Sequence, residues 1–183
     1  INMITNNNTE SCSLCPRECG ADRTKKTGLC GAGRLPRVAA AMLHRWEEPC
    51  ISGSGGSGAV FFSGCPLGCI FCQNKKISAG NFGGEITAAR LSEIKLELKE
   101  KGAQSINLVS PTQYVLQIIE ALAPIKTELG IPVVYNTGGY EKPGTVRMLK
   151  GLVDIYLPDV KYFSSELSYR LSGAADYFEM AMS

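Results

Sequence analysis

From residue 58 onward, short apolar runs alternate with segments of helical periodicity, and no other feature of the chain constrains its fold as strongly. The apolar runs predict strands at residues 59–64, 105–110, 131–136 and 153–160. Helices are predicted between and after them, at residues 88–101, 115–129, 145–150 and 166–171. This order predicts βα units around a parallel sheet, whose strands are apolar throughout because both faces are buried.

The length of the chain limits how many such units it can hold. It has 183 residues, whereas a closed eight-unit barrel needs about 250. We therefore expect an α/β fold that forms part of a (β/α) TIM-like barrel, truncated after about four βα units. Residues 12–50 are rich in Gly, Pro, Arg and Cys and have little periodicity, which predicts an irregular segment. The predicted boundary separates a cysteine-rich N-terminal extension with a Gly/Ser linker, residues 1–57, from an α/β core, residues 58–183.

Three cysteines, Cys65, Cys69 and Cys72, follow the first predicted strand with the spacing C-x3-C-x2-C. Thiolates bind soft metals and iron–sulfur clusters, and a short glycine-containing loop lets three of them face one compact cluster. Because a four-iron cluster has four corners, three cysteines leave one iron open, much as a catalytic zinc site keeps an open position. Two alternatives are a structural zinc site completed by Cys50 and a set of buried thiols without a metal.

Polar residues follow each of the other predicted strands. The carboxyl ends of parallel strands meet at one edge of the sheet, where α/β proteins bind their ligands, so we expect these residues to lie around the cysteine loop. The alternative interpretation is an ordinary turn after the third strand and a solvated ion pair after the fourth. The candidates for cofactor binding at this edge are Ser110, Thr112, Asn136, Thr137, Asp159 and Lys161.

A second set of cysteines lies near the N-terminus, in the pattern C-x2-C-x3-C-x10-C. Four thiolates this close together suit either a closed zinc site or a second iron–sulfur cluster, and nearby Pro and Gly residues supply the turns that either would need. The sequence does not separate the two alternatives, and we slightly favour the cluster. The four ligand candidates are Cys12, Cys15, Cys19 and Cys30. Cys50 is left without an assigned role.

Composition argues against several classes of partner. The formal net charge is only +2, and the densest basic stretch, Arg23 to Lys26, is short and is predicted to be a solvated loop, so nucleic acid is not an expected partner. No apolar run approaches the ~18 residues needed to cross a bilayer, and the polar first dozen residues contain no signal-peptide core. We therefore expect a cytoplasmic protein without a membrane partner. In that reducing environment, eight cysteines indicate metal or redox chemistry rather than disulfides.

The cysteine loop resembles the signature of radical S-adenosylmethionine (SAM) enzymes, which have the same spacing and an aromatic residue before the third cysteine, here Phe71. The resemblance implies a 4Fe–4S cluster on Cys65, Cys69 and Cys72, with SAM chelating the open iron. It implies reductive cleavage of SAM to methionine and a 5′-deoxyadenosyl radical, with Phe71 near the adenine. The cofactors would carry the difficult chemistry, and the protein would position them.

The stretch from Cys65 to Lys161 is similar, more narrowly, to pyruvate formate-lyase activating enzymes, and closest to relatives with an N-terminal cysteine motif. Asn136-Thr137-Gly138-Gly139 stands where that family has Asp-Thr-Asn-Gly, and Asp159-Val160-Lys161 where it has Asp-Leu-Lys. The similarity implies that Lys161 contacts SAM and that the Asp and Thr positions lie near a monovalent cation. Ser110-Pro111-Thr112 replaces the family's Gly-Gly-Glu, and Gln73 replaces its His. A Gly83-Gly84-Glu85 occurs elsewhere and is predicted to be a turn.

The function that this similarity implies is activation of a glycyl radical enzyme, with electrons supplied by a flavodoxin- or ferredoxin-type reductant. One alternative is a radical SAM enzyme that modifies another protein, an RNA or a small molecule. The other is a non-catalytic iron–sulfur or zinc protein that transfers electrons or binds a partner, and it predicts no affinity for SAM.

Overall fold

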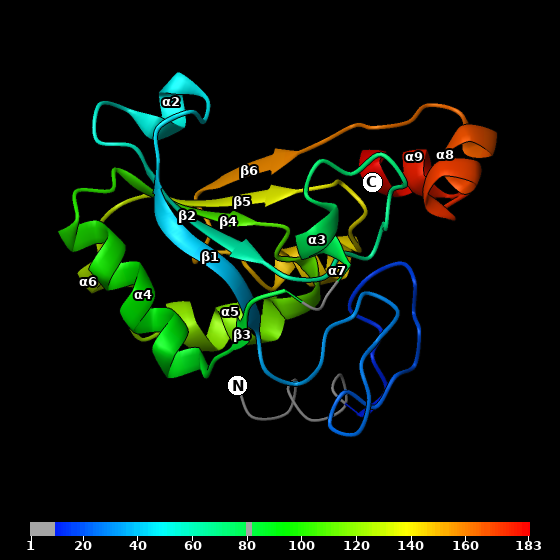
Figure 1. Cartoon of the computed structure of the whole chain (residues 1–183), viewed down its shortest axis with the longest axis horizontal. Helices are drawn as coiled ribbons and strands as arrows, with labels where there is room; N and C mark the ends of the chain where they lie inside the picture. Colours follow the sequence, from blue (N-terminus) through cyan, green and yellow to red (C-terminus); the bar gives the residue numbers. More distant parts are fainter. Residues whose placement is uncertain (1–9, 80–81) are drawn as a thin grey trace.

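The structure is a computed structural model that describes residues 10–79 and 82–183. Within these ranges, six strands form one sheet in the order β3-β1-β2-β4-β5-β6 (Figure 1). Four strands are parallel to one another: β2 (Ser57–Phe62), β4 (Ser105–Val109), β5 (Val133–Thr137) and β6 (Ile155–Pro158). They correspond to the four predicted strands, so the predicted parallel α/β core is confirmed. Over the described residues the sheet is open, with β3 and β6 at its edges, and the partial barrel stays a prediction.

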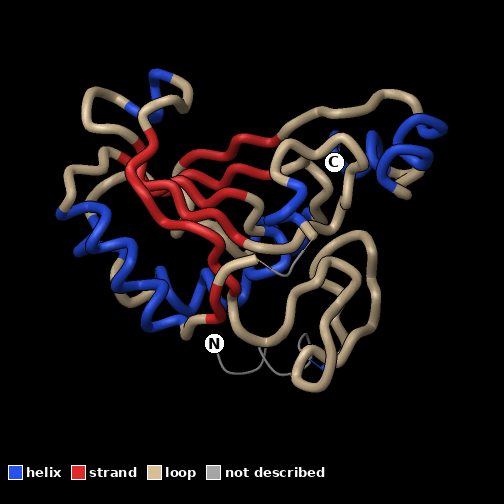
Figure 2. The backbone as a smooth tube through the Cα atoms, viewed as in Figure 1, coloured by secondary structure: helices blue, strands red, loops and turns tan. Residues whose placement is uncertain are grey.

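Two strands of the sheet were not predicted. β1 (Arg37–His44) lies in the segment expected to be irregular and pairs antiparallel with β2. β3 (Gly84–Glu85) pairs with the start of β1, so the interpretation of Gly83-Gly84-Glu85 as a simple turn was wrong. β1 escapes prediction because its centre is a run of alanines without apolar and polar alternation, and most of its residues are only partly buried. Residues 11–36 contain no helix or strand, and Figure 2 shows them as loop.

The four predicted helices are present, with differences at their ends, and the short helices α2, α3 and η1 were not predicted. Thr87 caps α4 as expected, its Oγ1 accepting a hydrogen bond from the backbone N–H of Arg90 at 3.1 Å. The second predicted helix is split beside Pro124, which cannot continue an α-helix. The helices are α2 (Pro49–Ser52), α3 (Lys75–Ser78), α4 (Ala88–Glu100), α5 (Val115–Leu122), α6 (Lys126–Leu129), α7 (Pro143–Arg147), α8 (Ser165–Ser172), α9 (Tyr177–Met182) and the 3₁₀ helix η1 (Thr112–Tyr114).

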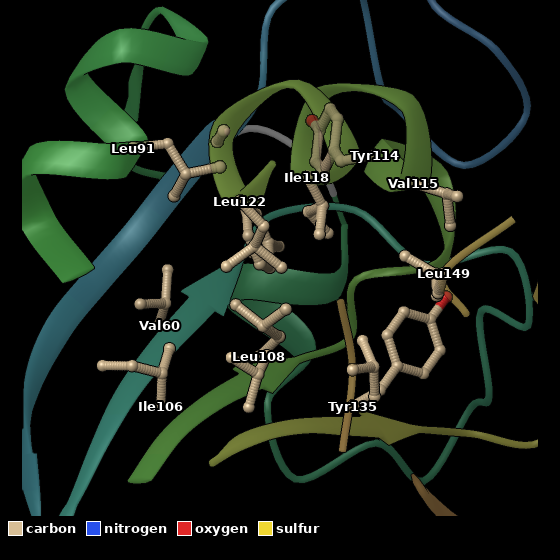
Figure 3. Packing of buried hydrophobic residues seen from close by; sticks show 14 of the residues in the cluster. Val60, Leu91, Ile106, Leu108, Tyr114, Val115, Ile118, Leu122, Tyr135 and Leu149 are labelled. Atoms are coloured by element: carbon tan, nitrogen blue, oxygen red, sulfur yellow. The ribbon is translucent and has the colours of Figure 1, made fainter. Parts of the chain in front are cut away.

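The main hydrophobic core lies between the sheet and the helices α4 and α5. Figure 3 shows side chains from β2, β4 and β5 meeting side chains from these two helices. Cys30 and Ala32 belong to the same core, so the N-terminal segment packs against the sheet. The core residues labelled in the figure include Val60, Leu91, Ile106, Leu108, Ile118, Leu122 and Tyr135.

Arg23 corrects the expectation of a solvated basic loop. Its side chain is 2% exposed. The guanidinium donates hydrogen bonds to the carbonyl oxygen of Gln113 at 2.6 Å and to that of Gly33 at 2.7 Å. Gln113 in turn donates to the carbonyl oxygens of Ser63 and Gly64 at the end of β2. Arg23 therefore ties the N-terminal segment to the sheet, while the following residues 24–26 are exposed as predicted.

Lys95 is buried on α4, on the same helix face as Leu91 and Leu98. Its side chain is fully inaccessible, and no described residue accepts a hydrogen bond from its Nζ. Burial disfavours the ammonium form and lowers the pKa of Lys95 to about 7. The charged form of this buried amine therefore destabilises the folded protein.

Replacing Lys95 with methionine should raise the free energy of unfolding at pH 7 by about 1–3 kcal/mol, because the buried amine has no partner to lose. The folded-state pKa lies below the unfolded value of ~10.4, so the unfolded chain binds more protons between those two values and stability rises with pH there, by up to ~1.4 kcal/mol per pH unit. Urea unfolding at pH 7 and pH 9 should show this slope in the native protein and in Lys101→Met, an exposed control, but not in Lys95→Met. A slope that survives in Lys95→Met would contradict the assignment.

Candidate functional site

The candidate site lies at the carboxyl ends of the parallel strands. The arrowheads of β2, β4, β5 and β6 point to the side of the molecule that holds α3, α8, α9 and the blue N-terminal segment (Figure 1). The loop after β2 carries the three cysteines, and the polar residues predicted for cofactor binding lie at the ends of the other strands or just after them. The prediction that these groups share one edge of the sheet is therefore met by the topology.

The three-cysteine loop begins with a glycine that no other residue could replace without strain. Gly64 has a φ of +89°, and a Cβ at this position would lie 2.4 Å from the carbonyl oxygen of Cys30. That oxygen accepts a hydrogen bond from the backbone N–H of Cys65 at 3.1 Å, so the loop starts in direct contact with the N-terminal segment. A second hydrogen bond, from the N–H of Cys72 to the carbonyl of Cys69 at 3.2 Å, folds the loop back on itself.

The thiols of this loop lie in a partly apolar, aromatic environment. Cys69 is buried against Leu67, Tyr140, Tyr162 and Tyr177, and Cys65 and Cys72 pack at the border of this cluster. The hydroxyl of Ser172 at the end of α8 donates a hydrogen bond to Cys69 Sγ at 3.1 Å. Burial raises the pKa of Cys65, with the neighbouring thiols of Cys69 and Cys72 adding to the shift. Three thiols on one loop, backed by a hydroxyl donor, are a donor set that fits an iron–sulfur cluster.

Single-ion sites are not found in the part of the chain that the structure describes. No group of three or more His, Cys, Asp and Glu side chains in residues 10–79 and 82–183 is placed to hold a metal ion. The zinc alternative with Cys50 is wrong, because Cys50 lies on α2, at the amino end of β2, whereas the loop leaves its carboxyl end. A strand of this length separates its ends by about 20 Å. Cys50 is also exposed.

A small cavity of about 10 Å³ lies beside Cys65 and is lined by residues from three strand ends. Ser110, Thr112 and Thr137, three of the predicted cofactor-binding residues, contribute to its walls with Gly138 and Tyr140. Ser110 has a φ of +54°, a left-handed conformation that costs a non-glycine residue free energy and is often found at functional sites. The structure thus brings these three residues next to the cysteine loop.

Glu141 is a site residue that the sequence analysis missed. Its Oε1 accepts hydrogen bonds from the hydroxyls of Thr112, at 2.5 Å, and Thr137, while Tyr135 Oη lies 3.5 Å away. The carboxyl joins the residues that follow β4 to the end of β5. Its Oε2 has no hydrogen-bond partner among the described residues. The residue lines a cavity of about 310 Å³ together with Thr137, Tyr135 and Tyr156.

Burial determines the protonation of Glu141. Desolvation raises its pKa to about 7, although the hydrogen bonds from Thr112, Thr137 and Tyr135 act in the opposite direction. In the sequence Glu141 is a single acidic residue after a Thr-Gly-Gly turn, and no periodic pattern marks it as buried. The hydroxyls of Thr112 and Thr137 were predicted to face a cofactor. Both instead donate hydrogen bonds to the Glu141 carboxyl.

The remaining predicted residues are more exposed. Asn136 is partly buried on β5 and lines neither of the two cavities described above. Lys161 Nζ lies 2.6 Å from Asp159 Oδ2, so the ion pair considered as an alternative is present. Burial by itself would lower the pKa of Lys161, but the hydrogen bond and the charge of Asp159 outweigh this effect. The pKa of Lys161 is therefore raised. Phe71 is 54% exposed, and its ring forms a T-shaped contact with that of Tyr162, the two centroids lying 6.0 Å apart.

The four N-terminal cysteines gather around tight turns in the segment 11–36. Cys12, Cys15 and Cys30 are buried, and Cys19 is partly buried. Gly28 lies between two of their sulfurs: a Cβ there would be 3.3 Å from Cys19 Sγ and 3.5 Å from Cys30 Sγ. Burial raises the pKa of Cys15 to about 12, and the other three thiols add to the shift. A side chain at position 28 would therefore press against both sulfurs.

Comparison with known proteins decides the family. Residues 59–182 match the family model of the radical SAM superfamily. The chain belongs to this superfamily. It is also 30% identical, over 186 aligned residues, to Uncharacterized protein MJ0674 of Methanocaldococcus jannaschii, a match that covers 97% of this chain and 53% of that protein. The chain therefore spans about half the length of this relative.

The radical SAM superfamily implies a 4Fe–4S cluster and SAM as cofactors, as the resemblance of the cysteine loop predicted. The loop lies inside the matched residues and at the edge of the sheet where α/β proteins bind ligands. The narrower similarity to pyruvate formate-lyase activating enzymes stays a prediction. Within the described ranges, no helix of this radical SAM protein is long and apolar enough to cross a membrane.

Proposed function

We propose that the chain binds a 4Fe–4S cluster through Cys65, Cys69 and Cys72 and cleaves SAM reductively. The observation that carries the proposal is the placement of three thiols on one loop after β2, beside a small cavity formed by three strand ends. Three thiolates would leave one iron of a four-iron cluster without a protein ligand. In the superfamily the bound cluster supplies one electron to SAM, which yields methionine and a 5′-deoxyadenosyl radical.

The residues of the chain have supporting roles in this proposal. Ser172 orients the Cys69 thiol through its hydrogen bond, and the tyrosines packed around Cys69 exclude water from it. Phe71 is a half-exposed aromatic ring against which an adenine could stack. Lys161 would exchange its exposed partner Asp159 for the SAM carboxylate, and the backbone and Ser110 would serve in place of the threonine hydroxyls that Glu141 occupies.

For the substrate, we propose a glycyl radical enzyme that the chain activates, and this proposal rests on sequence similarity. Its support is that the two similar motifs, at Asn136–Gly139 and Asp159–Lys161, end neighbouring strands β5 and β6. The electron would come from a flavodoxin- or ferredoxin-type reductant. A monovalent cation near Asn136 and Thr137 stays a prediction, since the Thr137 hydroxyl already donates to Glu141.

An anaerobic turnover assay tests the proposal. The reconstituted protein, reduced with dithionite and given SAM, should release 5′-deoxyadenosine and methionine in equal amounts, detected by liquid chromatography and mass spectrometry. An added glycyl radical enzyme should then acquire a protein-based radical signal. A protein that holds its cluster but neither binds nor cleaves SAM would instead support the electron-transfer alternative.

A further inference from the structure

The N-terminal cysteine segment touches the three-cysteine loop at two places. The first is the hydrogen bond from the N–H of Cys65 to the carbonyl of Cys30, which joins a cysteine of one set directly to a cysteine of the other. The second is Arg17, which lies between Cys15 and Cys19 in the sequence. The two cysteine sets are therefore linked through both backbone and side chain.

The guanidinium of Arg17 donates hydrogen bonds to backbone carbonyls of two separate parts of the chain, the three-cysteine loop and the end of α8. Its Nε donates to the carbonyl of Pro66 at 2.8 Å, and its Nη2 lies 3.4 Å from that of Leu67, both in the three-cysteine loop. The other guanidinium contacts are the carbonyl of Ser172, at 2.5 Å, and that of Gly173, at the C-terminus of α8. A cation at a helix C-terminus is also favourable for the helix dipole. The same Ser172 donates its hydroxyl to Cys69 Sγ.

Further contacts hold the guanidinium in place. It lies over the ring of Tyr140, 5.3 Å from the centroid, and Tyr140 packs in the same cluster as Cys69. The adjacent Glu18 forms an ion pair with Lys142 Nζ, 2.5 Å away, in the loop after β5. The short stretch 17–18 therefore meets the loop after β2, the loop after β5 and the end of α8.

The position of this stretch depends on the cysteines that flank it. Residues 11–36 have no helix or strand of their own, and short segments of this kind are commonly held in shape by a metal bound to thiolates. The glycine between Cys19 Sγ and Cys30 Sγ leaves the space between those sulfurs free of side chain. A ligand shared by these thiols would fix Arg17, because Arg17 is only two residues from each of Cys15 and Cys19.

We propose that Cys12, Cys15, Cys19 and Cys30 bind a second iron–sulfur cluster, which is wider than a single metal ion, and that this cluster holds Arg17 against the three-cysteine loop. Arg17 is thus a positioning residue for the SAM-cluster loop, acting through the carbonyls of Pro66, Leu67 and Ser172. The second part of the proposal rests on the proposed cluster at Cys65, Cys69 and Cys72, whereas the first part does not.

Metal analysis of a triple variant tests the first part. In the triple variant Cys65→Ser, Cys69→Ser, Cys72→Ser, the chain reconstituted with iron, sulfide and zinc should keep metal, measured by plasma mass spectrometry and the visible spectrum. Iron with acid-labile sulfide would support the cluster, and zinc without colour would overturn it. Retention of neither metal in this variant, with the fold intact by circular dichroism, would overturn the proposal. Neither result depends on SAM cleavage.

The substitution Arg17→Gln tests the second part. It removes the guanidinium but none of the thiols, so the metal of the N-terminal set should be retained. The reduced loop cluster should show a changed electron paramagnetic resonance spectrum and should lose iron to a chelator about ten-fold faster, as expected when an outer contact of a metal site is removed. Arg17→Lys should not restore the native spectrum, because an ammonium cannot bridge several carbonyls as the planar guanidinium does.

The control is Arg170→Gln, which alters an exposed arginine on α8 near the same helix end. It should leave both the spectrum and the rate of iron loss unchanged. The quadruple variant Cys12→Ser, Cys15→Ser, Cys19→Ser, Cys30→Ser should reproduce the effect of Arg17→Gln on the loop cluster. An unchanged loop-cluster spectrum and iron-loss rate in Arg17→Gln would overturn the positioning role. All spectra are recorded without SAM, so a failure of SAM cleavage would not be mistaken for a failure of this inference.

Discussion

Replacing Cys69 with alanine should remove the iron of the loop cluster and lower 5′-deoxyadenosine formation by at least about a hundred-fold, since loss of a ligand exceeds the 10–100-fold cost of losing an outer contact. Cys69 is the most enclosed of the three thiols, packed among tyrosines and hydrogen-bonded to Ser172. Without it, two cysteines would have to hold a cluster that already has one iron without a protein ligand. The measurement is iron and sulfide content after anaerobic reconstitution, followed by the SAM turnover assay.

Cys50→Ala is the matched control for this variant. Cys50 is an exposed cysteine at the opposite end of β2, so its loss should change neither iron content nor turnover. Any metal at the N-terminal set is subtracted by comparison with the triple loop variant. Undiminished iron content and SAM cleavage in Cys69→Ala would show that the loop does not hold the cluster.

Glu141→Ala should lower the free energy of unfolding by about 2–4 kcal/mol, because it leaves two buried hydroxyls without their acceptor. Those hydroxyls, on Thr112 and Thr137, line the cavity beside Cys65, so we also expect weaker SAM binding. Glu141→Gln should keep most of the stability, since its amide oxygen can accept both hydrogen bonds. Urea unfolding followed by circular dichroism measures the two effects.

The pH dependence separates Glu141 from an ordinary buried residue. Its folded-state pKa, about 7, lies above the unfolded value. The folded protein therefore binds more protons between ~4.3 and 7, so this group's contribution to stability is fully present below pH ~4.3 and is lost as pH rises through 7, by about 3 kcal/mol in all. Glu141→Gln should abolish this decline, and Glu120→Gln, an exposed control on α5, should retain it. The window lies below that of Lys95, which acts in the opposite direction above pH 7.

The fold and the placement of the site could be predicted because both follow from periodicity and topology. Continuous apolar runs separated by helical segments indicate buried parallel strands, and parallel strands bring their carboxyl ends together. The three-cysteine loop and Ser110, Thr112 and Thr137 therefore meet at one edge, as expected. The alanine-rich strand β1 was missed because its composition indicates no particular element.

What could not be predicted are single charged residues whose burial depends on distant parts of the chain. Arg23 and Lys95 resemble solvated charges in the sequence, yet both side chains are buried. Glu141 finds its partners on η1 and β5, and Arg17 on the cluster loop and α8. Such partners are set by tertiary contacts, which a local pattern does not encode.

The most direct test of the radical SAM assignment is an electron paramagnetic resonance spectrum of the reconstituted, dithionite-reduced protein, recorded with and without SAM. If Cys65, Cys69 and Cys72 hold a 4Fe–4S cluster with one open iron, the reduced protein will show a cluster signal, and SAM will shift it by binding to that iron. The same shift should be absent from the triple loop variant, whatever its N-terminal cysteines bind. A cluster signal that SAM leaves unchanged, or a protein that retains zinc and no iron, would contradict the account.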